Sequence, residues 1–498
     1  MHLRPSISRS TFIRSVSLVI ALLSHFLIGC VAQSWKTYPS SINGYLGMSF
    51  PEAEANHPND GSDTWFVTAR LTGLNTGKEY QIVTIFDRNA IAVNPVVLNF
   101  YEVSIFDCLN GEYVTYTDYE LPVLNLLSPK LQVSSDHLDL LYRSSAGNAT
   151  WVTAKDALGD LRPFVYDLYL PGSDSFGSGP FSVDITADMQ NRPVAWGADD
   201  LRGVMTCFGE TDTYSYFQTG PEINGTLTFR GVTEPVQGTL GHLDRQWFPT
   251  TPLIYAPTGR QRSHEWRQMN LNNSVDLSIW RQFDRTNNNT VVDTTGTTAY
   301  QGDSSTWTAG LPSDLTIEYI RYKKYPRSTS IGTLVPPPSP NMYLATEHIV
   351  RSASLAMELK GTYVQETPAI NLVIEYFEGP IMWQGTYNGQ NVNGIGIFET
   401  TYALYRDWEL TEVLYNSLAH LQNASFSSKS KSEVLQIVAG LRQYVSSNPL
   451  QDNRIAAGLY ITGSIIPALQ TMSAGSDKSN MLTIAADLQY SLTLILQF

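Results

Sequence analysis

The chain has 498 residues, of which 42% are hydrophobic and 11% aromatic, so it can bury more than one hydrophobic core and is not disordered. Its 46 acidic and 32 basic residues give a net charge of −14, which argues against nucleic acid as a partner, because phosphate binding needs a basic surface. Only 16% of the residues are charged, so much of the surface must consist of uncharged polar residues.

The N-terminus has the layout of a secretory signal peptide over residues 1–32. Three arginines between positions 4 and 14 precede an apolar run over 16–28, and Cys30 and Ala32 supply small residues before the expected cleavage site. The run is shorter than the roughly 20 apolar residues that a spanning helix needs. We therefore expect cleavage after Ala32 and a secreted or vesicular protein with no stable membrane span.

Strands are expected through most of the chain from Asp63 to Thr401, where short runs of β-branched and aromatic residues alternate with turn residues. No long helical pattern interrupts them, so the sheets should be mainly antiparallel. A proline-containing segment after Trp247 marks a domain boundary. The expected strands cover residues 65–71, 80–86, 96–106, 226–230, 275–283, 315–325, 354–360, 371–378 and 395–402.

Two cysteines, Cys108 and Cys207, would remain after cleavage of the signal peptide. They can pair in an oxidising compartment, but sequence alone does not show whether they lie close enough, so a disulfide and two free thiols both remain open. The cysteines are too few and the histidines too scattered for a convincing metal site. Sites for N-glycosylation occur at Asn148, Asn224, Asn272, Asn288 and Asn423.

The most informative segment lies between Gly241 and Phe248. Successive side chains of an extended strand point to opposite faces. His242, Asp244 and Gln246 should therefore share one polar face. Leu243, Arg245 and Trp247 should share the other, which is apolar and aromatic with one cation. This pattern suits the wall of a ligand-binding β-structure.

The last hundred residues change character, because apolar residues there recur at helical spacing. Helices are expected over residues 409–421, 434–445 and 480–496. The final eight residues, 491–498, are also compatible with a strand. These elements form a helical extension over residues 403–498.

Several blocks resemble one family of lipocalin-like proteins. The carrying blocks are Trp65-Phe66, Tyr214 to Phe217, Gly225 to Thr228, Val236 to Gly238, Asp244 to Trp247, His264 to Trp266, and Gly394 to Glu399. The family contains hydroxyneurosporene synthase-type carotenoid hydratases, kievitone hydratase and fungal Diels–Alderases. The resemblance implies two lipocalin-like β-domains, over 33–250 and 251–402, and a cofactor-free enzyme acting on apolar terpenoid or polyketide-derived substrates. The helical extension departs from the shorter members.

The candidate residues can be assigned to either of two chemistries. A cycloaddition needs an apolar, aromatic cavity that folds a flexible polyene, and a hydrogen-bond donor that polarises it. A hydration needs a buried carboxyl of raised pKa, for which Asp244, Glu265, Glu375 and Glu399 are available. Candidate catalytic residues are His242, Asp244, Arg245, Gln246 and Glu399. Candidate aromatic walls are Trp65, Tyr101, Tyr216, Trp247, Trp266 and Trp280.

Structural roles compete with each of these assignments. Asp244 and Arg245 can form an ion pair that joins strands or domains, and Glu399 can pair with Arg245 at a barrel closure. The tryptophans can be simple core residues.

Three functions remain open. The first is a fungal Diels–Alderase that cyclises a linear polyketide–amino acid intermediate in secondary metabolism. The second is a hydratase or dehydratase of an isoprenoid or prenylated phenolic compound. The third is a lipocalin-like carrier without chemistry. In each, the expected partner is an apolar small molecule, and the oligomeric state is not predicted.

Overall fold

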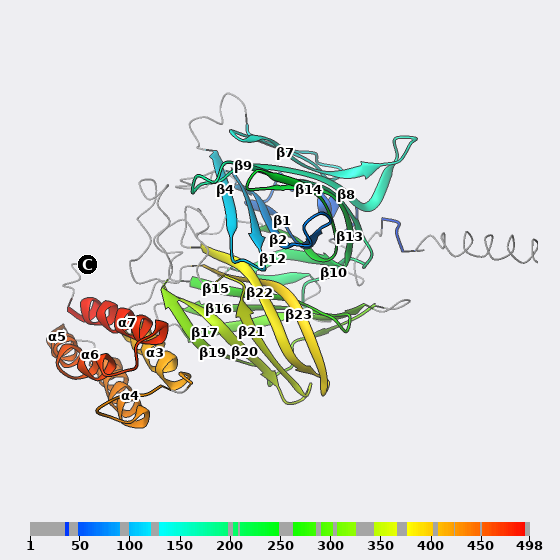
Figure 1. The fold of residues 1–498 in the computed structure, drawn as a ribbon. Helices are drawn as coiled ribbons and strands as arrows, with labels where there is room; N and C mark the ends of the chain where they lie inside the picture. The colour runs from blue at the N-terminus through cyan, green and yellow to red at the C-terminus, as the bar shows by residue number, and fades with distance from the viewer. Residues whose placement is uncertain are drawn as a thin grey trace, which may run out of the picture.

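The structure is a computed structural model, and it describes residues 35–38, 48–89, 99–120, 129–197, 203–207, 210–248, 262–284, 290–301, 306–324, 343–365, 376–401, 407–422, 424–448 and 451–493. The expected signal peptide over residues 1–32 lies outside this part of the chain. The described residues form two curled antiparallel sheets followed by a group of helices beside the second sheet (Figure 1). The expected mainly β fold with antiparallel sheets is therefore confirmed.

The first sheet runs in the order β4-β3-β2-β1-β14-β13-β9-β8-β7-β6-β5. Its long strand β14 pairs with β1 along most of its length, and on its other edge with β13 and then β12, to which β10 and β11 attach. The strands are β1 (Ser62–Gly73), β2 (Glu79–Asn89), β3 (Asn99–Asp107), β4 (Tyr113–Glu120), β5 (Leu131–Val133), β6 (Asp139–Ser144), β7 (Gly147–Lys155), β8 (Leu161–Ser173), β9 (Pro180–Met189), β10 (Val194–Ala195), β11 (Val204–Cys207), β12 (Glu210–Thr219), β13 (Pro221–Phe229) and β14 (Val232–Phe248).

The second sheet runs in the order β18-β17-β16-β15-β23-β22-β21-β20-β19. Its strands are β15 (Arg262–Leu271), β16 (Val275–Asp284), β17 (Thr290–Gln301), β18 (Thr306–Gly310), β19 (Thr316–Lys324), β20 (Tyr343–Ser352), β21 (Met357–Tyr363), β22 (Tyr376–Tyr387) and β23 (Gln390–Thr401). The strand expected from residue 354 begins only at Met357, because the backbone turns at Ala356, whose φ is 43°.

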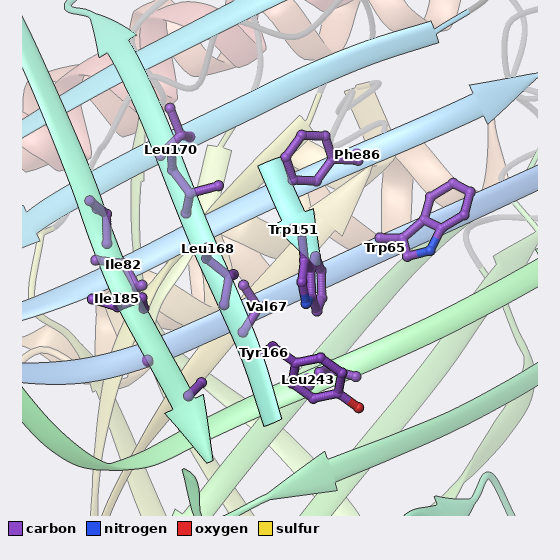
Figure 2. Close-up of a cluster of buried hydrophobic side chains, with 14 of the residues drawn as sticks. Trp65, Val67, Ile82, Phe86, Trp151, Tyr166, Leu168, Leu170, Ile185 and Leu243 are labelled. Atoms are coloured by element: carbon purple, nitrogen blue, oxygen red, sulfur yellow. The ribbon is translucent and has the colours of Figure 1, made fainter. Parts of the chain in front are cut away.

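The strands of the first sheet that lie against the second sheet, such as β3, have two buried faces with different surroundings, whereas β9 and β13 bury one face. The inner face lies inside the curl of the sheet, where Trp65, Val67 and Leu243 pack with Trp151 and Tyr166 (Figure 2). The outer face carries a second apolar cluster, which joins the two sheets. Its members are Phe66, Val83, Ile85, Phe100, Phe106, Val194, Trp196, Met205, Phe217 and Phe248 from the first sheet and its loops, and Trp266, Trp280, Ala299 and Ile397 from the second. We call this contact region the seam.

The N-terminal part of the chain fills the inside of the first sheet. Phe50 and Ala53 belong to the inner cluster, and the 3-10 turn Glu52–Glu54 follows Phe50 directly. The indole N–H of Trp65 donates to the Glu54 carbonyl at 3.0 Å, and Arg245 Nη2 donates to the Ala55 carbonyl at 2.7 Å. The chain itself therefore occupies space that a ligand would take in a simple lipocalin-like barrel.

The C-terminal helices form their own core against β19. They are α3 (Asp407–Ala419), α4 (Lys431–Ser447), α5 (Gln451–Tyr460), the π-helical turn η4 (Ile461–Ile465), α6 (Ile466–Gln470) and α7 (Ser476–Thr493). Asp487 accepts hydrogen bonds from Lys324 Nζ at 2.5 Å and from the Tyr343 hydroxyl at 2.6 Å, which attaches α7 to the sheet. The three expected helices are confirmed as α3, α4 and α7.

The helical segment between α4 and α7 was not predicted, because Gly458, Gly463 and Pro467 interrupt its pattern. No helix in the described ranges is long and apolar enough to cross a membrane.

Candidate active site

Strand β14 presents its motif residues on two opposite faces, as its alternation predicts. Leu243 and Trp247 lie in the inner cluster of the first sheet. His242 lies on the outer face, where its ring is 5.3 Å from the ring of Trp266 in the second sheet. Asp244 shares this face. The motif therefore contributes its polar face to the seam and its apolar face to the interior of the first sheet.

His242 is enclosed by aromatic rings of both sheets. It stacks on Phe217 at a ring distance of 5.0 Å, and the Phe66 ring lies 6.5 Å away. Its side chain is 1% exposed, and neither ring nitrogen has a hydrogen-bond partner among the described residues. Asp244 Oδ2 lies 3.7 Å from His242 Nε2, too long for a direct hydrogen bond. A buried imidazole with both nitrogens open is available for proton transfer or for a ligand.

Asp244 is held toward its neutral form. Burial raises the pKa of this carboxyl; His242 opposes the rise, and the nearby Glu399 adds to it by like-charge repulsion. Because Asp244 comes from the first sheet and Glu399 from the second, this repulsion acts across the seam and adds to the larger effect of burial. Neither sheet alone contains the pair.

Glu399 binds a histidine rather than the arginine considered from the sequence. Its Oε1 forms a short contact with His264 Nε2, and the His264 ring stacks on Trp280 at 4.1 Å with an interplanar angle of 13°. Glu399 also lies directly opposite Trp266 on β15 and Glu378 on β22. The suggested pairing of Glu399 with Arg245 is wrong, because the two side chains lie on different faces of different sheets.

A third buried carboxyl, that of Asp276 in the second sheet, binds a residue of the first sheet near His242. Asp276 Oδ2 accepts a hydrogen bond from the Thr219 hydroxyl of the first sheet at 2.5 Å, and its Oδ1 accepts one from Asn270 Nδ2 at 2.5 Å. Burial raises the pKa of Asp276, and these two hydrogen bonds and His242 partly offset that rise. Sequence reasoning did not select Asp276, since its position in an alternating strand gives no hint that a histidine of another sheet lies nearby.

Arg245 has a structural environment. It is fully buried on the inner face, where Nη1 donates to Asp63 Oδ1 at 2.8 Å and also to the Thr64 carbonyl. Its guanidinium lies 4.1 Å from the Trp65 ring centroid. The suggested ion pair of Asp244 with Arg245 is therefore wrong, and Arg245 pairs with Asp63 instead. Sequence reasoning did not identify Asp63 as the partner of Arg245.

Gln246 is not completely buried, and its side-chain nitrogen lies 3.8 Å from Met205 Sδ.

The structure divides the predicted aromatic walls between two places. Trp266 and Trp280 line the seam. The other four lie in the inner cluster of the first sheet, namely Trp65, Tyr101, Tyr216 and Trp247. The six residues therefore do not enclose one pocket. Phe66 and Phe217 line the seam instead, and they can be recognised in retrospect because they alternate with Trp65 and Tyr216 along their strands.

The remaining predicted sites stay predictions. Cys108 is a free thiol, and the side chain of Cys207 lies outside the described residues. Asn148, Asn224 and Asn272 are exposed, as glycosylation would require. Asn288 and Asn423 lie outside the described ranges. Within those ranges no group of three or more His, Cys, Asp or Glu side chains is arranged to hold a metal ion.

Two curled antiparallel sheets of this lipocalin-like kind occur in other solved structures. Kievitone hydratase from Nectria haematococca shares this fold, with a TM-score of 0.51 and 18% identity over 74% of this chain and 97% of that chain. A putative AttH (NE1406) from Nitrosomonas europaea shares it with a TM-score of 0.50 and 17% identity over 73% of this chain and 99% of that chain.

A protein called CghA, solved with Sch210972, is more distant, with a TM-score of 0.38 and 11% identity over 68% of this chain and 88% of that chain. The shared fold is therefore defined by the first two structures. No protein-family model matches the sequence, and no curated protein matches it.

Proposed function

We propose that this chain is a hydratase or dehydratase that adds water to, or removes water from, a carbon–carbon double bond of an apolar isoprenoid or prenylated phenolic compound. The main observation behind this proposal is that two carboxyl–imidazole pairs lie in the buried aromatic seam. Asp244 lies beside His242 on the first sheet, and Glu399 lies beside His264 on the second. One of the two proteins that define the shared fold is by name a hydratase, which supports the same choice.

The two pairs suit the two halves of a hydration. Asp244, whose pKa burial and the nearby Glu399 raise, transfers a proton in its protonated form to one alkene carbon and leaves a tertiary cation on the other. The faces of Trp266 and Phe66 stabilise that cation. Glu399, oriented by His264, accepts a proton from the water whose oxygen bonds to the cation. The proton then passes from Glu399 back to Asp244, so the sum is one water added with both carboxyls restored, and dehydration runs the same steps backwards.

Cycloaddition is the second candidate, because the seam also offers flat aromatic surfaces. The His242 ring stacks on Phe217 of its own sheet and lies 5.3 Å from the tilted Trp266 ring of the other sheet, and such walls can hold a polyene in a folded conformation. A cycloaddition would not need Asp244 to change its protonation state. The two candidates therefore differ in their products and in their dependence on this carboxyl.

Mass analysis of the product separates the candidates. Purified protein is incubated with prenylated phenols and with linear polyenes in ¹⁸O-labelled water. Hydration adds one labelled water, cyclisation leaves the mass unchanged, and a carrier leaves the compound unaltered. We expect Asp244→Asn and Glu399→Gln to lower the rate by roughly 10²–10⁴-fold, the range typical of general acids and bases. Glu112→Gln, a half-exposed glutamate that pairs with Arg230 outside the seam, serves as control and should leave the rate unchanged.

A hydration rate that is unaltered in Asp244→Asn would remove the proposed acid. A product of unchanged mass would move the assignment to cyclisation.

We also propose that the protein enters the secretory pathway. The signal-like N-terminus supports this proposal, as does the exposure of Asn148, Asn224 and Asn272, which leaves them accessible to glycosylation. Expression of the full chain in a fungal host tests it. We expect a mature N-terminus at Gln33 and a mass that decreases on treatment with an N-glycosidase, whereas an intracellular chain retaining Met1 would contradict it.

A further inference from the structure

Glu102 is a buried acid that the proposed reaction does not use. It lies in the middle of β3 and is 0% exposed. Its neighbours Tyr101 and Val103 belong to the inner cluster of the first sheet, whereas Phe100 and Phe106 belong to the seam cluster. Since side chains alternate along a strand, Glu102 lies on the seam side, the same face of the sheet as Asp244.

The carboxyl of Glu102 is only half satisfied. Oε1 accepts a hydrogen bond from the Ser104 hydroxyl, and Oε2 has no partner among the described residues. The hydroxyl of Thr117, directly opposite on β4, also has none. Burial raises the pKa of Glu102 to about 8, and only the hydroxyls of Ser104 and Thr115 offset it, with no nearby cation. The side chain is therefore a neutral carboxylic acid at pH 7, with donor capacity to spare.

Glu234, another buried glutamate of the same sheet, has the hydrogen-bond partners expected of a carboxylate with a structural role. Glu234 is 1% exposed, yet it accepts hydrogen bonds from the Tyr80 hydroxyl at 2.9 Å and from the Thr76 hydroxyl at 2.8 Å. It also accepts from the backbone N–H groups of Asn75 and Thr76. Burial opposes its ionisation, but these bonds outweigh burial and lower its pKa. Glu102 has no such set of partners, so a structural role does not account for it.

Strand register places Glu102 in line with the candidate active site. Asp244 lies opposite Phe66, Phe66 lies opposite Ile85, and Ile85 lies opposite Glu102. The line crosses three strand spacings, or roughly 14 Å. Phe66 and Ile85 between the two acids are both members of the seam cluster. The outer face thus carries an apolar strip with a buried carboxyl of raised pKa at each end.

We propose that Glu102 is a substrate-binding residue that donates a hydrogen bond to a carbonyl or hydroxyl oxygen at the far end of the substrate. This inference depends on the proposed function for the position of the reactive end at Asp244. It defines the substrate class as an apolar molecule with an oxygen function about three strand spacings, or roughly 14 Å, from its reactive double bond. The benefit of the bond offsets the cost of keeping an unpartnered carboxyl in the seam.

Binding of two unreactive probes tests the proposal without any turnover. 2-Dodecanone and dodecane have the same chain length, and only the ketone can accept a hydrogen bond. Binding is followed by quenching of tryptophan fluorescence, to which Trp266 and Trp280 in the seam contribute. We expect the wild type to bind the ketone about tenfold more tightly than the alkane, as one net hydrogen bond allows. Glu102→Leu should abolish this preference, and Glu102→Gln, which still donates, should retain most of it.

Glu54→Gln is the matched control, because Glu54 is also a buried acid of raised pKa but is hydrogen-bonded to Tyr166 on the inner side of the sheet. It should keep the wild-type preference. Thermal unfolding gives a second measurement. Glu102→Leu should be at least as stable as the wild type, since it removes an unpartnered buried carboxyl.

A ketone preference that survives in Glu102→Leu would overturn the proposal, as would equal loss of the preference in Glu54→Gln or a large loss of stability in Glu102→Leu. The probes contain no double bond, so these results stand apart from the reaction. If the preference depends on Glu102 but no compound is hydrated, the binding residue stands and the proposed reaction fails.

Discussion

Asp244 and Arg245 are neighbours in sequence with unrelated tasks in the fold. The alternation of β14 turns Asp244 toward the seam and Arg245 toward the inner core. Asp244 remains without a strong partner, whereas Arg245 donates to a carboxylate and to two backbone carbonyls. In the proposed hydration, the same short motif therefore supplies one residue for chemistry and one for stability.

Replacement of Arg245 tests its structural role. In Arg245→Met the carboxylate of Asp63 remains buried without its cation, so we expect the free energy of unfolding to fall by about 3–5 kcal/mol. Urea denaturation followed by circular dichroism measures this. Arg162→Met is the control, because Arg162 forms an exposed pair with Asp188, and its replacement should cost less than about 1 kcal/mol. Equal effects of the two replacements would contradict the assignment.

Glu54 makes stability depend on pH. Burial raises its pKa from an ordinary 4.5 to about 7, and the hydrogen bond from the Tyr166 hydroxyl and the charge of Arg245 only partly offset this. The folded chain keeps a proton that the unfolded chain has released. This contribution is therefore complete below about pH 4.5 and is lost as the pH rises toward 7.

We predict that Glu54→Gln flattens the decline of stability between about pH 5 and 7, by on the order of 3 kcal/mol. Chemical denaturation at several pH values gives the slope. A variant whose slope equals that of the wild type would show that Glu54 ionises normally.

At the scale of elements, the second sheet depends on the close approach of β15 and β23. A Cβ atom at Gly396 would lie 1.7 Å from the backbone oxygen of Gln268. This close approach keeps β23 in register, with Glu399 opposite Trp266. The glycine therefore positions the carboxylate of the candidate site through the backbone.

Two glycine replacements test this dependence. Gly396→Ala should destabilise the protein by several kcal/mol and disturb the seam, because the backbone must move to admit the methyl group. Gly440→Ala should stabilise it by about 0.5–1 kcal/mol, since Gly440 lies within α4 with open space around it. Differential scanning calorimetry compares them, and a neutral Gly396→Ala would show that the strand contact is not tight.

The elements themselves were largely predictable, and the site was not. Alternation and turn residues predicted β1, β2, β3, β13, β14, β16, β19, β21, β22 and β23, and helical spacing predicted α3, α4 and α7, because these signals are local. The partners of each strand are not local: Asp63 and Arg245 are 182 residues apart. The sequence therefore indicated that Trp65 and Trp266 are buried without showing that one faces the inner core and the other the seam.

At the scale of the whole molecule, neither sheet contains a complete site. Asp244 and His242 come from the first sheet, and Glu399 and His264 come from the second. The hydrogen bonds from Thr219 to Asp276 and from the Gly197 N–H to the Thr297 hydroxyl, at 2.5 and 2.7 Å, fix the two sheets against each other. Phe50 and Ala53 of the N-terminal segment pack inside the first sheet, and the proposed function therefore places the ligand in the seam.

The crystal structure of a ligand complex tests this location most directly. Crystals grown with a prenylated phenol should show its double bond between Asp244 and Glu399, its apolar body over Phe66, and its oxygen toward Glu102. Ligand density inside the first sheet, against Trp151 and Tyr166 with the N-terminal segment displaced, would contradict the account.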